Sequence, residues 1–173
     1  MPCTCTYTYL CFESLLRERI ACVGNLMFNS SSGVVITPIA KKAKKTSPCS
    51  FTDYNEQEER SANGLEIFWD DSKSNKTKSG DLFVFRFDSL RVVFHVVEDV
   101  SDSSNRLESW SKNVGQTDRN VLKLSKKSAV VPWEKWSEFK YCGGRQGTTY
   151  MDGLKNAGIK AEILEYANER FVA

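Results

Sequence analysis

The stretch at 79–100 reads SGDLFVFRFDSLRVVFHVVEDV and holds the densest run of strand-forming residues in the chain. A short polar break at 88–90 divides it into two apolar segments and is short enough for a tight hairpin turn. Because side chains alternate across a strand, both segments present apolar residues on both faces. The pattern therefore predicts a hairpin of strands 82–87 and 91–100 that lies inside a sheet or barrel, not at a half-exposed edge.

Alternation also assigns each residue of the hairpin to a face. In the first strand, Phe83, Phe85 and Phe87 share one face. In the second strand, Val100 is expected on the same face as Val92, Phe94 and Val96, and the opposite face carries Arg91, Val93, His95, Val97 and Asp99.

Shorter segments on both sides of the hairpin complete the expected fold. Composition and spacing favour strands at 3–11, 34–39, 65–69, 120–125 and 159–164. Helices are expected at 12–22, from Pro132 to Phe139, and at 149–157 with Gly158 as its C-terminal cap. Strands and helices do not alternate regularly. The order therefore predicts an α+β fold, with a mixed, strongly curved sheet or small β-barrel and about three short helices.

The length of 173 residues is typical of one domain, so we expect a single domain over 1–173. One segment, 41–64, differs from the rest of the chain in composition. It opens with Lys41, Lys42, Lys44 and Lys45, becomes acidic, and has few apolar residues. We expect a mobile basic and acidic loop insert there, either a phosphate-binding arm or, as favoured, a solvated loop.

Composition narrows the class of protein. Hydrophobic residues make up 40% and charged residues 27%, and the net charge of +2 is too small to argue for a nucleic-acid partner by itself. No run reaches the length of a membrane span, and no leader pattern opens the chain, so an intracellular protein, cytoplasmic or nuclear, without a membrane partner is expected. Six cysteines without a CxxC pair and a single histidine argue against zinc, and no cofactor is expected.

Candidate catalytic groups are few. His95 lies mid-strand among valines, where a packed histidine is more common than a base. Asp70, Asp71 and Asp81 could hold a divalent cation, which leaves a small metal-dependent hydrolase as one alternative. Carboxylates beside strands more often cap turns, so the sequence favours a binding protein over an enzyme and assigns no catalytic residue.

The residues 111–145 combine positive charge with aromatic rings. They carry eight Lys and Arg against three acids, a net charge of +5, and Trp133 and Trp136 lie within the segment, next to Trp110. Basic side chains contact phosphates and aromatic faces stack on bases, so this mixture favours DNA or RNA as partner. The alternative is that the tryptophans belong to the core. A protein without enzymatic activity that contacts another protein, through a sheet edge or the loop at 41–64, also stays open.

The order of features over 65–137 resembles the EVE domain, a relative of YTH and PUA-like modules. Its elements here are Phe68-Trp69-Asp70, the turn and strand KSGDLFVF at 78–85, a valine-rich strand at 92–97, Trp110, a strand at 121–124 and a helix near Trp133. The resemblance implies a PUA-like barrel that accepts a flipped or modified base in an aromatic pocket. The residues expected to bind are Trp69, Trp110, Lys112, Arg119, Lys123, Lys126, Lys127 and Arg145.

Overall fold

The computed structural model describes residues 27–41, 51–72, 75–102, 119–140, 147–151 and 154–172. The strand expected at 3–11 and the helix expected at 12–22 lie outside these residues.

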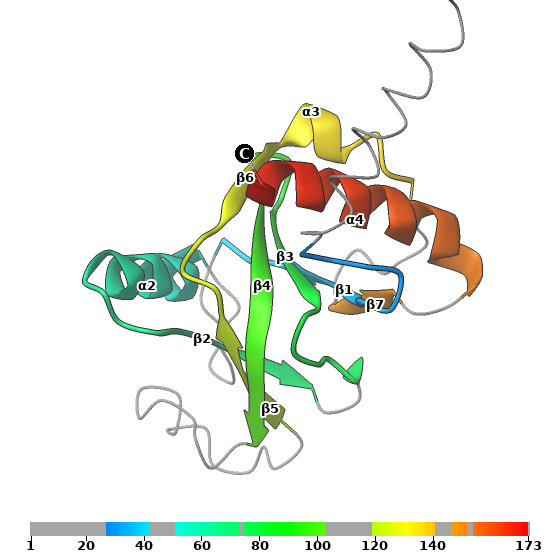
Figure 1. Cartoon of the computed structure of the whole chain (residues 1–173). Coiled ribbons are helices and arrows are strands. Elements are labelled where there is room, and N and C mark those ends of the chain that lie inside the picture. Colours follow the sequence, from blue (N-terminus) through cyan, green and yellow to red (C-terminus); the bar gives the residue numbers. More distant parts are fainter. Residues whose placement is uncertain are drawn as a thin grey trace, which may run out of the picture.

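Seven strands of the described residues form one mixed sheet that curls strongly (Figure 1). The strand order is β2-β5-β4-β3-β1-β7, with β6 also paired to β4. All pairs are antiparallel except β1 with β3. The strands are β1 (Val34–Pro38), β2 (Ile67–Ser72), β3 (Leu82–Phe87), β4 (Arg91–Asp102), β5 (Arg119–Leu124), β6 (Ala129–Pro132) and β7 (Thr149–Met151). The expected α+β fold with a curved, mixed sheet is confirmed.

The central hairpin is confirmed as β3 and β4, which pair from Leu82 opposite Val96 to Phe87 opposite Arg91. Both of its faces are buried, as the alternation predicts. One face joins a core cluster under α4 with Val84 and Phe94, and the other joins a second cluster with Phe83 and Phe85.

On the edge that does not pair with β3, strand β4 changes partners halfway along its length. Its first residues, Arg91–Phe94, pair with β6, and its later residues pair with β5 from Val97 onward. A bulge between Val97 and Asp99 marks the change. The extra residue reverses the alternation beyond it, so Val100 packs with the second cluster and not with Phe94, which corrects the face expected for it.

Helix α2 (Phe51–Ala62) occupies part of the segment expected to be a mobile loop. The loop prediction is wrong over these residues because the charged side chains mostly cover an exposed face, while Tyr54 and Gln57, three residues apart, are buried. The Gln57 Oε1 atom accepts the Phe68 N–H at 3.0 Å and so satisfies an outward-facing donor of edge strand β2.

Two further elements differ from expectation at the C-terminal end. Residues 149–151 form β7, followed by the 3-10 turn η5 (Leu154–Asn156), where a helix at 149–157 was expected. Helix α4 (Ala157–Val172) replaces the strand expected at 159–164. Its buried residues recur at helical spacing and cover one face of the sheet: Ile163, Leu164, Ala167, Asn168 and Phe171. The short helix α3 (Trp133–Trp136) follows Pro132 as expected, and Trp136 is buried.

A fully buried carboxylate connects three segments at the start of β3. Asp81 Oδ1 accepts the Gly33 N–H at 2.6 Å, and Asp81 Oδ2 accepts the Lys78 N–H at 2.9 Å and the Tyr150 hydroxyl at 3.4 Å. Gly33 tolerates this approach because it has no side chain: a Cβ there would lie 2.7 Å from the Tyr150 hydroxyl oxygen. The Lys78–Asp81 turn thus fixes β1, β3 and β7 together.

We expect Asp81→Asn to lower the free energy of unfolding by about 1–3 kcal/mol, because the amide NH2 group would face a backbone N–H and leave a buried donor without an acceptor. Urea unfolding followed by circular dichroism measures this loss. Asp99→Asn, at an exposed position of β4, is the matched control and should change stability by less than about 0.5 kcal/mol. Equal stability of the two variants would contradict the structural role of Asp81.

Candidate functional site

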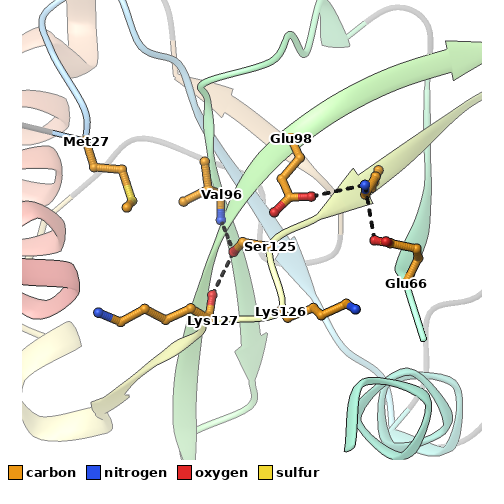
Figure 2. A pocket seen from close by; sticks show the side chains of 8 residues that line it. Met27, Glu66, Val96, Glu98, Ser125, Lys126 and Lys127 are labelled. Carbon is orange, nitrogen blue, oxygen red and sulfur yellow. Dashed lines mark hydrogen bonds and ion pairs between the residues drawn. The ribbon is translucent and has the colours of Figure 1, made fainter. Parts of the chain in front are cut away.

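A pocket of the described residues lies where β4 changes partners, beside the turn between β5 and β6. Its volume is about 450 Å³. Figure 2 shows the side chains that line it: Met27, Glu66, Val96, Glu98, Lys123, Ser125, Lys126 and Lys127.

Ser125, directly after β5, lines this pocket and satisfies both backbone groups of Val96, as a paired strand residue would. Its N–H donates to the Val96 carbonyl at 2.8 Å, and its Oγ accepts the Val96 N–H at 2.9 Å. The Ser125 hydroxyl then donates to the Lys127 carbonyl at 2.7 Å. These contacts fix the backbone of the turn, and with it the positions of Lys126 and Lys127.

Lys126 and Lys127 extend in opposite directions from the turn (Figure 2). The Lys126 ammonium donates to the Gly64 carbonyl, and the Lys127 ammonium donates to the Phe171 carbonyl, each at 2.6 Å. These carbonyls lie at the C-terminal ends of α2 and α4, where the helix dipole places partial negative charge. Among the described residues, no carboxylate forms an ion pair with either lysine, so their positive charges are not compensated by a neighbouring acid.

Lys123 has a different environment. Its ammonium lies 3.2 Å from Glu66 Oε2 and 3.5 Å from Glu98 Oε2. The hydrogen bond and charge of Glu66, followed by the weaker effect of Glu98, raise the pKa of Lys123. Its charge is thus already compensated, and the lining as a whole carries three ammonium groups and two carboxylates, a net charge of +1.

A smaller pocket of about 210 Å³ lies on the α2 side of the same turn and shares Lys126 with the larger one. Three buried side chains line it: His95, Tyr54 and Ile67. His95 Nδ1 lies 2.9 Å from the Ser125 carbonyl, which can only accept, so Nδ1 carries the proton. The bare Nε2 atom then accepts the Tyr54 hydroxyl at 3.0 Å. The neutral imidazole therefore links β4 to both the turn and α2.

Burial lowers the pKa of His95 to about 4, although its bond to the Ser125 carbonyl acts in the opposite direction. Burial also raises the pKa of Tyr54, and Glu58 adds to that effect. Neither group is therefore ionised near neutral pH. His95 is a packed histidine, as its place among valines predicts.

We expect acid to destabilise the fold through His95. Its pKa is about 6.5 in an unfolded chain and about 4 in the folded one, so the unfolded chain binds an additional proton between these values. The stability contribution is fully present above about pH 6.5 and falls by about 3 kcal/mol as the pH drops to 4.

The measurement compares urea unfolding of the wild type and His95→Asn at pH 7.5 and pH 4.5. The Asn amide can still donate to the Ser125 carbonyl but does not titrate, and all carboxylates are shared by the two proteins. The wild type should lose more stability on acidification than the variant, and identical losses would exclude His95 as the cause.

Of the other residues predicted to bind, the described ones, Trp69 and Arg119, do not line the larger pocket. Trp69 is 1% exposed and packs edge-on against Phe85, with 4.7 Å between ring centroids, so it offers no face for stacking in this structure. Arg119 Nε donates to the buried Asp70 carboxylate at 3.0 Å. Trp110, Lys112 and Arg145 lie outside the described residues.

The carboxylates considered for a metal site have separate structural roles. Asp71 accepts the Asn75 amide and the Thr77 hydroxyl, each at 2.6 Å, and burial raises its pKa. Asp70 pairs with Arg119, and Asp81 binds the backbone of its turn. In the described part of the chain, no three His, Cys, Asp or Glu residues gather as metal ligands would.

Sequence reasoning missed five residues of the larger pocket: Met27, Glu66, Val96, Glu98 and Ser125. Glu66 and Glu98 are far apart in the sequence and meet because β2 and β4 flank β5. The one available signal was the Lys126-Lys127 pair directly after a strand.

Comparison with known proteins adds no relative. No protein-family model matches the chain, and neither the curated proteins nor the solved structures contain a match. The resemblance to the EVE domain therefore stays a prediction. Of the helices described here, none is both long and apolar enough to cross a bilayer.

Proposed function

We propose that this protein binds nucleic acid at the larger pocket, with the strand backbone passing over the turn between β5 and β6. The observation that carries the proposal is the pair Lys126 and Lys127 on the rim of a pocket of about 450 Å³. Each ammonium is oriented by a backbone carbonyl, so its charge remains available to a phosphate.

The opposite directions of the two lysines favour a polymer over a single phosphate group. Because the side chains diverge (Figure 2), one phosphate cannot contact both ammonium groups, whereas two phosphates of one strand can. Between them lies a pocket whose volume falls in the range of about 300–1,000 Å³ that small organic ligands occupy. That volume supports entry of one unpaired base.

The described lining contains no aromatic side chain, so a base would pack on Val96 and Met27 instead of stacking on tryptophan. We therefore propose the flipped-base binding that the PUA-like resemblance implies, but at the β5–β6 turn and not at Trp69. We include recognition of a modified base in the proposal because a pocket of about 450 Å³ has room for a substituent on the base.

We expect Lys126→Ala combined with Lys127→Ala to weaken binding to single-stranded oligonucleotides of all sequences. The salt dependence should also decrease, by about 0.7 in log Kd against log salt for each phosphate that the variant no longer neutralises. Fluorescence anisotropy with labelled single-stranded RNA, single-stranded DNA and duplex DNA over a salt series measures both quantities.

The matched control is Lys155→Ala combined with Lys160→Ala, which removes the same charge from lysines that line neither pocket. Lys126 and Lys127 also contact helix ends, so the charge-preserving pair Lys126→Arg and Lys127→Arg separates loss of charge from loss of fold; it should bind like the wild type. Absence of salt-dependent binding by the wild type at low salt would refute the proposal.

A further inference from the structure

Two carboxylates on one wall of the larger pocket are unexpected in a site that only contacts phosphates. Glu66 and Glu98 are each less than half exposed on their side chains, at 44% and 43%, and both line the pocket. Carboxylates repel phosphate oxygens, so a site selected for phosphate alone would gain from their absence. Besides compensating the charge of Lys123, these carboxylates can accept hydrogen bonds from a second group of the ligand.

The geometry of Lys123 fixes these carboxylates. Its ammonium bridges Glu66 Oε2 and Glu98 Oε2, as the dashed lines of Figure 2 show. Both contacts with Lys123 use the Oε2 atoms of these side chains, which leaves their Oε1 atoms outside the ion pairs. An ionised carboxylate has acceptors and no donor, so the pocket presents two oriented acceptors to whatever enters it.

We infer that Glu66 and Glu98 select an unpaired base that bears an exocyclic amino group, with cytosine as the type case. This inference rests on the proposed nucleic-acid binding and names what the pocket recognises. The cytosine N4 amino group donates hydrogen bonds, whereas uracil presents the O4 acceptor at the same position. Two carboxylate acceptors therefore match the two hydrogens of the cytosine N4 group, whereas uracil offers a single N3–H donor between two oxygens that repel a carboxylate.

The rest of the lining suits the face of a base. Val96 offers an aliphatic surface, and Met27 adds a thioether, which makes favourable contacts with aromatic rings. Lys126 and Lys127 hold the flanking phosphates outside the pocket. Phosphate contacts position the strand, and the carboxylates supply the discrimination that phosphate contacts lack.

The test compares labelled oligocytidine and oligouridine of equal length by fluorescence anisotropy at one salt concentration. We expect the wild type to bind oligocytidine about 5- to 150-fold more tightly, the range that one good base contact supplies. Glu66→Gln combined with Glu98→Gln should reduce this ratio toward one and improve binding of oligouridine, because a Gln amide can donate to O4.

The control is Glu162→Gln combined with Glu165→Gln, which removes the same negative charge from exposed positions of α4 that line neither pocket. It should change the affinity for both oligonucleotides by the same factor and leave their ratio intact. Equal binding of the two oligonucleotides by the wild type, or an unchanged ratio in Glu66→Gln with Glu98→Gln, would overturn the inference and leave nucleic-acid binding standing. Failure of both oligonucleotides to bind would instead refute the proposed function itself.

Discussion

The exchange of partners along β4 is the constraint on which the rest of the structure depends. One strand pairs with β3 along one edge and divides its other edge between β6 and β5. At the junction, the Val97 N–H donates to the Asp81 carbonyl on one side, while Ser125 completes the hydrogen bonding of Val96 on the other. Without these substitutes, the bulge would leave backbone groups unpaired in the interior. The turn that Ser125 begins is therefore fixed by the sheet, and the pocket beside it is a consequence.

At the same junction, two lysines both stabilise helix ends and border the larger pocket. Lys126 and Lys127 complement the C-terminal ends of α2 and α4, and they also border the larger pocket. Gly64, with φ of 78°, ends α2 with the paired bonds that satisfy its last carbonyls, and its own carbonyl is left for Lys126. A strand of nucleic acid that engaged both lysines would share their ammonium groups with the helix ends, because each ammonium has three donors. Such binding would thus be coupled to the docking of the two helices through the same two ammonium groups.

The sequence predicted the central hairpin well because its alternation is local and both faces are apolar. It failed where a nonlocal contact decides. Val100 lies on the opposite face from the expected one because of a bulge that no local pattern reveals. Residues 51–62 form a helix because Tyr54 packs against Phe85 and Phe87. The segment 159–164 satisfies both the strand and the helix periods, and helical packing on the sheet prevails through Ala167 and Phe171. The candidate site was predicted in part: Lys126 and Lys127 were found by charge, whereas the Glu66 and Glu98 partners of Lys123 required the strand order.

The hydrogen bonds of His95 determine which side of the junction acid weakens first. Its Nδ1–H bond to Ser125 needs a proton on Nδ1 and persists when the ring is protonated. The Nε2 atom, by contrast, loses its lone pair on protonation and can no longer accept the Tyr54 hydroxyl. Burial of the charged ring is the main cost of protonation, and the contact with Tyr54 must also reverse its direction, whereas the bond to the turn is kept.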